Sequence, residues 1–327
     1  MAKKVSIVTV TYNQEQLISR TIDAILNQKT DFDIELIIGE DCSTDNTRQI
    51  VLGYQKKYPE KIKVITSETN VGIELNYLRC YRVCQGDYVA ICDGDDYWVD
   101  ELKLQKQVDF LENNKEYGLV GTALKYYNTE TNEILEEIVL NKNTTYSLET
   151  VFLKNPFTAS TVLFEWRLLD SFLELYEHTP ALENFIDYSL WLYFASKKKV
   201  AILKDITTAY GVSENAISQN KDTQKAWQYR KRNYNHFKFF DSYIDTIDNT
   251  TINAAYYNRA IWYYRLVAVN QDKEVYNEFV KIFEQNDKQR LFLLKILMKY
   301  PKTHSIVTLY EKARNRFFGT GERINKY

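Results

Sequence analysis

Three carboxylates crowd the short segment AICDGDDYWVD, in which Asp93, Asp95 and Asp96 lie within four positions of one another. Carboxylates repel each other, so a folded chain gathers them where they bind a group that needs several negative charges. Capping a helix or a turn takes one carboxylate and does not account for three. Gly94 permits a tight turn that aims two of them at one point. Mg²⁺ and Mn²⁺ take one or two carboxylates together with phosphate oxygens, so the segment predicts a metal and phosphate site.

The elements that must position this cluster alternate over the first 114 residues. Continuous apolar runs rich in β-branched residues predict strands, and amphipathic periods between them predict helices. The predicted strands are residues 5–12, 34–41, 62–68 and 87–93, and the predicted helices are residues 15–28, 43–58, 72–86 and 100–114. Short links between alternating strands and helices favour an α/β fold with a doubly wound, mostly parallel sheet and right-handed crossovers.

Polar residues follow each of the four predicted strands, at the edge where open α/β sheets bind their ligands. They are Thr11, Tyr12 and Asn13, then residues 40–43, residues 68–72 and residues 93–96. Acidic and amide groups from four loops therefore converge on one edge of the sheet. Residues 43–46 are also types that cap helices, so capping is the simpler interpretation of that stretch.

Length and composition limit the other classes of protein. The 327 residues, 45% of them hydrophobic, are enough for one large domain or for one domain with a smaller companion. A net charge of −2 gives no basic field for nucleic acid, and no apolar run reaches the about 18 residues of a membrane span. The cysteines and histidines lack zinc-ligand spacing, which indicates reduced thiols of a cytosolic protein. No GxxxxGK[ST] or GxGxxG pattern is present, which argues against ATPases and dinucleotide enzymes.

The second half of the chain predicts a mixed extension of the sheet followed by helices. Strand-like runs cover residues 118–128, 133–140, 158–164 and 199–204, and residues 184–196 form an amphipathic, helix-like run. From about residue 221 the pattern is helical and rich in Tyr, Phe, Lys and Asn. We therefore predict a first domain of residues 1–217 and a C-terminal helical region of residues 218–327.

The ordered motifs TYN, EDCSTDNT, NVG and DGDDYW, each after a predicted strand, resemble those of inverting family 2 glycosyltransferases of GT-A fold. The resemblance covers residues 4–115 closely and residues 116–215 loosely. The segment KLQKQVDFLE that follows is similar to bacterial members that make surface polysaccharides. The resemblance implies metal-assisted transfer of a sugar from a nucleoside-diphosphate sugar, with UDP as the expected nucleotide, to a hydroxyl of a glycan or a lipid-linked acceptor. It also implies Mn²⁺ or Mg²⁺ as cofactor.

The resemblance assigns a role to each matching position. The donor-binding positions are Thr11, Tyr12, Asn13, Asp41, Asn76, Asp93 and Asp96, and the metal-contacting carboxylate is Asp95. Thr11 and Tyr12 match residues that line the nucleotide pocket, and Asp41 matches the carboxylate that reads a uracil-type base. Asp93 matches the residue near the ribose, while Asp96 supports the metal site or faces the sugar. A metal at the diphosphate would neutralise the charge that grows on the leaving nucleoside diphosphate.

An inverting transfer also needs a base that takes the proton from the attacking acceptor hydroxyl. In the resembled family this is an Asp that opens a later helix, often in a Glu-Asp pair, and the matching residue here is Asp187 in ENFIDYSLWLYFAS. Glu183 is the alternate, because it lies four residues earlier and shares the same face if the helix has begun there. The simpler interpretation of Asp187 is an acidic residue favoured by the helix dipole.

Three positions depart from the family pattern. Ile186 occupies the place of the Glu in the Glu-Asp pair, and Leu75 replaces the basic residue usual before Asn76. Where the family often has Tyr-Arg-x-His, this chain has the four residues 210–213, Tyr-Gly-Val-Ser. The cation and the imidazole that cover the donor phosphates are thus missing, so the metal or another residue must carry more of the diphosphate charge.

Two other functions compete with the transferase interpretation. A sugar nucleotidyltransferase would place a Gly-rich basic loop after the first strand, and TYNQEQLI has neither Gly nor Lys. A nucleotide- or glycan-binding protein of the same fold that has lost catalysis would bind without metal-dependent turnover.

The last hundred residues contain apolar and amphipathic runs, AIWYYRLVAVN and RLFLLKILMKY, before a basic end with aromatic residues. A helical cap on the first domain or a dimer face is the simpler interpretation. Peripheral contact with the inner face of a membrane is the alternative, since basic amphipathic helices lie on anionic surfaces. The sequence therefore predicts a cytoplasmic protein with no nucleic-acid partner and leaves its oligomeric state open.

Overall fold

The computed structural model describes residues 5–183, 187–213 and 223–301 of the chain. They belong to two compact units, Met1–Ser213 and Glu214–Tyr327, which are treated separately below. The boundary predicted between residues 217 and 218 falls within residues 214–222, outside the described residues.

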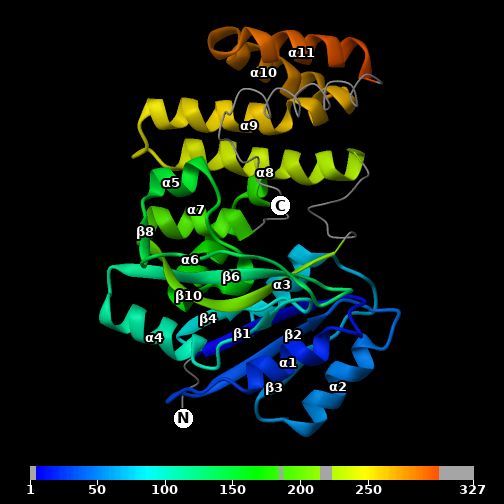
Figure 1. The fold of residues 1–327 in the computed structure, drawn as a ribbon, viewed down its shortest axis with the longest axis vertical. Coiled ribbons are helices and arrows are strands. Elements are labelled where there is room, and N and C mark those ends of the chain that lie inside the picture. Colours follow the sequence, from blue (N-terminus) through cyan, green and yellow to red (C-terminus); the bar gives the residue numbers. More distant parts are fainter. Residues whose placement is uncertain (1–4, 184–186, 214–222, 302–327) are drawn as a thin grey trace. The chain divides into compact units, whose positions relative to one another are not determined.

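The first unit is built on one large sheet (Figure 1). Its strands, as far as the chain is described, are β1 (Val5–Thr11), β2 (Ile34–Glu40), β3 (Ile62–Ile65), β4 (Tyr88–Ile91), β5 (Tyr97–Trp98), β6 (Tyr117–Asn128), β7 (Ile134–Glu137), β8 (Thr144–Tyr146), β9 (Leu163–Glu165) and β10 (Lys199–Val212). The strand order is β3-β2-β1-β4-β9-β6-β10-β5, with β7 beside β6 and β8 beside β10. Strands β1 to β4 are parallel, and beyond β4 the sheet is mixed.

Helices cover both faces of the parallel part. They are α1 (Ile18–Leu26), α2 (Thr47–Lys57), α3 (Ile73–Tyr81) and α4 (Lys103–Asn113), followed by α5 (Leu148–Leu153), α6 (Trp166–Glu177) and α7 (Asp187–Lys197). Helices α1, α2 and α4 share one buried core with alternate residues of the strands, among them Val5 and Ile7. Helix α3 packs on β1 and β2 but contributes nothing to that core, so it covers the opposite face. The predicted doubly wound α/β fold is confirmed.

Two predicted strands have different bounds for local reasons. Residues 158–164 were expected to form a strand, but Ala159–Thr161 form a 3₁₀ turn and β9 begins at Leu163. The Thr161 hydroxyl donates to the Thr158 carbonyl at 2.7 Å, a local bond that competes with a strand ladder. Strand β10 continues past residue 204 to Val212, because register shifts between Leu203 and Thr208 absorb the polar residues there.

Close contact between α3 and β2 depends on Gly39. The Asn76 side chain is buried and donates to the Gly39 carbonyl at 2.8 Å, while its oxygen accepts from Arg79 at 2.6 Å. A Cβ added at Gly39 would lie 2.4 Å from the Asn76 oxygen and 2.6 Å from the Cys80 sulfur. The absence of a side chain at Gly39 therefore lets α3 approach the strand that leads to Asp41.

The second unit is helical. Its described helices are α8 (Thr223–Tyr243), α9 (Asn249–Val269), α10 (Lys273–Asn286) and α11 (Lys288–Lys299). An Asp side chain at the N-terminus of each of the last three accepts from backbone N–H groups; these are Asp248, Asp272 and Asp287. Aromatic rings fill the core, and the Arg259 guanidinium lies 3.5 Å from the centre of the Phe237 ring. Among the described helices, none has the length and apolarity needed to cross a bilayer.

Replacing Gly39 with Ala tests the packing of α3 against the sheet. We expect the free energy of unfolding to fall by about 1–3 kcal/mol, because the new methyl group overpacks a buried contact. Gly53, on the outer face of α2, is the matched control, since an added Cβ meets nothing within 4 Å there. Gly53→Ala should raise stability by about 0.5–1 kcal/mol. Urea unfolding of both variants checks this, and equal stability of the Gly39→Ala variant and the wild type would contradict the packing argument.

Candidate active site

The loops after β1 and β2 are tied together by Asn13. Its backbone has φ of 53°, a left-handed conformation that Asn tolerates better than most residues. Its side-chain oxygen accepts from the Thr44 N–H at 2.8 Å, and its own N–H donates to the Ser43 hydroxyl at 3.0 Å. The neighbouring Tyr12 ring is 45% exposed. Asn13 thus positions the two loops, and Tyr12 is available as an aromatic surface beside them.

Asp41, directly after β2, fixes the loop that precedes α3. Its carboxylate is 3% exposed and accepts from the Val71 N–H at 2.8 Å and the Gly72 N–H at 2.9 Å. Gly72 has φ of 87°, which an L-residue rarely adopts. The structure therefore shows Asp41 and the buried Asn76 bonded within the protein, and their contact with a donor base stays a prediction.

The acidic segment after β4 lies against the end of β1. The Gly94 N–H donates to the Val10 carbonyl at 3.1 Å. A Cβ on Gly94 would lie 2.3 Å from the Gln14 side-chain oxygen and 3.0 Å from Thr11. The close approach of the two loops therefore favours glycine at position 94. The same approach brings Thr11 beside the acidic segment.

Asp93 is held by two hydroxyl-bearing side chains. Its N–H donates to the Ser160 hydroxyl at 2.9 Å, and the Tyr77 hydroxyl donates to its carboxylate. Burial, followed by the negative charge of Asp95, raises the pKa of Asp93 to about 7, against the lowering effect of the Tyr77 bond. Asp187 contributes to the same rise, so the base candidate lies within electrostatic reach of Asp93.

Asp96 is the most deeply buried acid of the segment, at 1% exposure. One carboxylate oxygen accepts from the Gly211 N–H at 2.7 Å, and the other has no hydrogen-bond partner among the described residues. Burial and the charges of Asp95 and Asp93 raise its pKa well above the usual range. Burial also raises the pKa of Asp95, although the Gln14 side chain lowers it. Burial therefore disfavours the charged form of both Asp95 and Asp96.

Asp187 opens α7 in a partly buried position. Burial raises its pKa to about 6, while the Tyr188 N–H, which donates to it at 2.7 Å, lowers the pKa. The Trp191 indole lowers it as well, although its N–H falls short of a hydrogen bond with any described residue. Glu183, the alternate base, is exposed. The next three residues, 184–186, which include Ile186, lie outside the described residues.

Several residues that the sequence did not single out support this region. Burial raises the pKa of Tyr210 well above its usual range, and the charges of the four carboxylates, that of Asp96 first, add to the rise. The Arg20 guanidinium lies 4.0 Å from the centre of the Tyr97 ring and donates to the Tyr127 hydroxyl. That hydroxyl in turn donates to the Asp95 carbonyl. No sequence spacing could reveal these contacts, since they join α1, β6 and the acidic loop.

Gly211 explains the departure at residues 210–213. A Cβ at this position would lie 2.5 Å from the Asp95 carbonyl oxygen and 2.9 Å from Thr129. With the acidic loop on this path, a side chain such as the Arg of the family pattern does not fit at 211. The missing cation is therefore linked to the packing of β10 against Asp95 and Asp96.

The carboxylate oxygens of the acidic segment are suited to a hard divalent cation, for which the protein would supply only some of the ligands. No three His, Cys, Asp or Glu side chains of the described chain are grouped closely enough to enclose a metal ion. Asp96 nevertheless presents a buried carboxylate oxygen without a partner, beside the carboxylate of Asp95. Such an arrangement suits an ion whose remaining ligands are water and phosphate oxygens.

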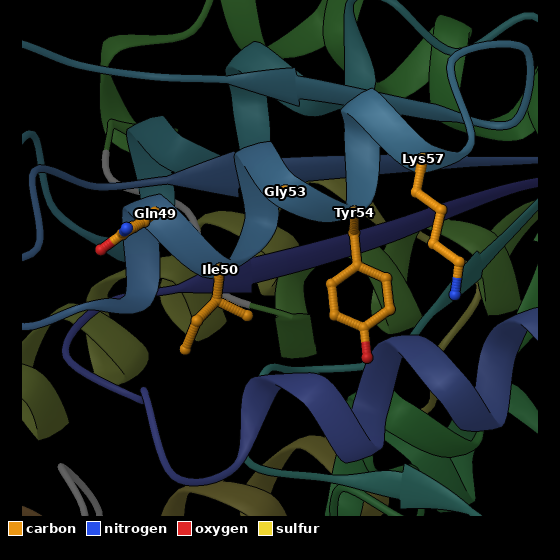
Figure 2. Close-up of a pocket in the computed structure, with 5 residues that line it drawn as sticks. All are labelled: Gln49, Ile50, Gly53, Tyr54 and Lys57. Atoms are coloured by element: carbon orange, nitrogen blue, oxygen red, sulfur yellow. The ribbon is translucent and has the colours of Figure 1, made fainter.

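A surface pocket elsewhere on the first unit has a different character. Figure 2 shows Ile50 and Tyr54 of α2 pointing toward α1, and Gln49, Gly53 and Lys57 complete the lining. The Tyr54 hydroxyl donates to Asp23 of α1 at 2.8 Å. None of the predicted site residues lines this pocket, so it gives no support to a catalytic role.

Comparison with known proteins identifies the family. The model of glycosyl transferase family 2 matches residues 6–166. An uncharacterized protein of Mycobacterium tuberculosis is 30% identical over 227 residues, which are 69% of this chain and 64% of that protein, so the chain spans about two thirds of this relative. The putative teichuronic acid biosynthesis glycosyltransferase TuaG of Bacillus subtilis is 29% identical over 71% of this chain and 90% of its own length.

A further relative and a solved structure agree with this assignment. WfgD of Escherichia coli, a UDP-Glc:α-D-GlcNAc-diphosphoundecaprenol β-1,3-glucosyltransferase, is 29% identical over 68% of this chain and 83% of its own length. The structure of Staphylococcus aureus TarS 1–349 in complex with UDP-GlcNAc superposes with a TM-score of 0.64 and 18% identity, over 95% of this chain and 92% of that chain. At this identity the structural likeness shows a shared fold.

Replacing Asp93 with Asn tests the charge crowding. The folded protein keeps the Asp93 proton up to about pH 7, whereas the unfolded chain releases it near pH 4, so the wild type loses stability as pH rises between them. Relative to the wild type, the Asp93→Asn variant should therefore gain up to about 4 kcal/mol across this range, because each pKa unit corresponds to about 1.4 kcal/mol. Urea unfolding at a series of pH values, with a chelator present, measures the difference.

Asp45→Asn is the matched control with the opposite sign. Bonds from Thr47 and Glu15 lower the pKa of Asp45 against the opposing effect of burial, so its contribution to stability is present at neutral pH and is lost in acid. The Asp45→Asn variant should be less stable than the wild type at neutral pH, with a difference that shrinks as pH falls. A pH-independent difference for Asp93→Asn would contradict the crowding argument.

Proposed function

The chain belongs to glycosyl transferase family 2, and from this premise we propose that it is an inverting, metal-assisted enzyme using a nucleoside-diphosphate sugar. The observation that carries the proposal is the electrostatic coupling of Asp93, Asp95, Asp96 and Asp187 in one partly buried region that is crowded with carboxyl groups. A cation and its bound diphosphate would supply the missing compensation. UDP is the expected nucleotide, which the likeness in fold to a UDP-GlcNAc complex supports.

Asp187 is the base in this proposal. Inversion requires the acceptor hydroxyl to attack the anomeric carbon from the face opposite the leaving diphosphate, and its proton must pass to a nearby group. With a pKa of about 6, the Asp187 carboxyl is ionised at neutral pH and basic enough to accept that proton. The Tyr188 N–H bond orients the carboxylate at the start of α7.

Asp95 would hold the divalent cation, with the free oxygen of Asp96 beside it. When bound, Mn²⁺ or Mg²⁺ supplies neutralisation of the charge that develops on the leaving nucleoside diphosphate. Neighbouring groups hold this segment in place: the Gly211 backbone N–H donates to the Asp96 carboxylate, and the Tyr127 hydroxyl donates to the Asp95 carbonyl. Since position 211 carries no Arg, the proposal makes the enzyme strongly dependent on the cation.

The acceptor in this proposal is a growing glycan or a lipid-linked sugar, in the synthesis of a bacterial surface polysaccharide. The activities for which TuaG and WfgD are named support this class of acceptor. A nucleoside-diphosphate donor is a cytoplasmic metabolite class, so the reaction would take place on the cytoplasmic side. Loss of catalysis with retained nucleotide binding is the outcome that would favour the binding-protein alternative.

Calorimetry with UDP, GDP and CDP, each with and without Mn²⁺, tests the donor site. We expect UDP to bind in the presence of Mn²⁺, and Asp95→Ala to weaken that binding by roughly 100-fold, because a cation–diphosphate contact contributes several kcal/mol. Asp109→Ala removes an exposed acid of α4 that bonds Gln105, and it should leave UDP binding unchanged. If none of the nucleotides binds with any metal, the transferase proposal is refuted.

Replacing Asp187 with Asn tests the base. We expect kcat to fall by about 10²–10⁴-fold, the usual contribution of a general base, while UDP affinity stays unchanged. In the wild type, kcat/KM should rise with pH and level off above about pH 6, because the carboxyl must lose its proton first. Initial rates with a UDP-sugar over a range of pH provide both measurements.

Glu183→Gln is the matched control, since Glu183 is the exposed alternate. The Glu183→Gln variant should have the same kcat as the wild type and the same fall in kcat/KM at acid pH. If Glu183→Gln loses the rate instead, or if Asp187→Asn retains it, the base assignment moves away from Asp187.

A further inference from the structure

Charge is distributed very unevenly along the chain. Residues 288–327 contain ten Lys or Arg and two Asp or Glu, whereas residues 1–287 contain 32 and 42. A chain with a net charge of −2 therefore carries a strongly basic C-terminal part, which begins at α11. Uneven charge of this kind affects how a protein associates with charged surfaces, and it does not specify the fold.

Helix α11 separates this charge from its apolar residues. Leu293, Leu294 and Leu297 are buried in the core of the second unit. At 3.6 residues per turn, the exposed residues Lys288, Phe292, Lys295 and Lys299 fall within roughly 60° of arc on the opposite side. Phe292 is 63% exposed at the middle of this stripe. The outer face of α11, defined by these four residues, thus combines three cations with a protruding aromatic ring.

The three lysines are not neutralised by the protein. Among the described residues none of them forms an ion pair with a carboxylate, and Lys299 lies 5.3 Å from the centre of the Tyr300 ring. The nearest acid in sequence, Asp287, is engaged with Arg290, whose guanidinium donates to it at 2.7 Å. The outer face therefore presents uncompensated positive charge together with exposed apolar surface.

We propose that the outer face of α11 binds an anionic membrane surface. Lysines attract acidic headgroups, and an aromatic ring between them inserts at the boundary between headgroups and acyl chains. A helix that lies in this plane needs one apolar anchor and a rim of cations, which is the pattern of Phe292 and its three neighbours. Because the argument uses only α11 and its charge, it does not rest on the donor site.

Other occupants of this face are disfavoured by the same charges. In a two-fold contact with a second copy, identical faces meet, so lysines would oppose lysines. Residues 302–327 of the chain carry six Lys or Arg against two Glu, so they too are basic and would be repelled. Nucleic acid is anionic too, but Phe292 is the one aromatic residue among the four residues of this face, whereas nucleic-acid surfaces present several aromatic residues on which bases stack.

Flotation of the full chain with lipid vesicles tests this proposal. Wild-type protein should float with phosphatidylcholine vesicles that contain phosphatidylglycerol, and should remain behind with phosphatidylcholine alone or in about 0.5 M salt. The triple variant Lys288→Glu, Lys295→Glu, Lys299→Glu should reduce partitioning by roughly 100-fold or more. Phe292→Ser should reduce it by roughly tenfold, because one apolar anchor is lost.

The matched control makes the same change of charge elsewhere. Lys56, Lys61 and Lys63 are exposed residues of the first unit, and the triple Lys→Glu variant at these positions should float like the wild type. Circular dichroism should show all variants folded, since every changed residue is exposed. Their UDP binding should equal that of the wild type, which separates a failure of this proposal from a failure of the donor site.

Three results would overturn the proposal. Wild-type protein that ignores acidic vesicles excludes an anionic membrane as the partner. Equal loss of flotation in the control triple variant shows that net charge, and not α11, governs binding. Flotation that a short DNA duplex abolishes more readily than salt does, with Phe292→Ser unaffected, assigns the face to nucleic acid.

Discussion

Repulsion among Asp93, Asp95, Asp96 and Asp187 is the constraint on which the first unit depends. Burial raises the pKa of all four carboxyls, and no Lys or Arg among the described residues forms an ion pair with them. Arg20 is held by Tyr97 and Tyr127, and the buried Lys103 bonds Gln107 at 2.5 Å and the Thr161 carbonyl at 3.1 Å. In the transferase proposal, a cation and its diphosphate would supply the charge compensation that this cluster lacks.

The backbone makes this arrangement possible through two close approaches. Gly94 lets the acidic loop lie against Thr11, and Gly211 lets β10 lie against the Asp95 carbonyl. Each glycine replaces a side chain with a backbone hydrogen bond: the Gly94 N–H reaches Val10, and the Gly211 N–H reaches Asp96. The close packing of β10 against the acidic loop therefore explains both the absence of a basic side chain at position 211 and the burial of Asp96. In the transferase proposal, a bound cation would supply the positive charge that is missing there.

The sequence predicted the parallel half of the sheet because each strand there is a continuous apolar run that ends in polar residues. The same pattern predicted that polar loops meet at one edge of the sheet, while the roles of the residues there stay predictions. It could not predict Tyr77, Tyr210 or the Arg20–Tyr127 contact, because these depend on tertiary neighbours that no local pattern records. It also mistook residues 158–164 for a strand, since β-branched Thr and Val favour strands while hydroxyl bonds favour turns.

The two units differ in charge. Residues 1–213 contain 22 Lys or Arg and 32 Asp or Glu, and an acidic surface is repelled by an anionic membrane. If the acceptor is carried by a lipid, as in the proposed function, the enzyme has to overcome that repulsion, and basic residues at the carboxylate cluster would do so only by neutralising it. The cations of α11 belong to the second unit, so they would attract an acidic membrane without adding positive charge to the carboxylate cluster. On this proposal, the outer face of α11 with Phe292 and the crowded acids of the first unit have complementary roles.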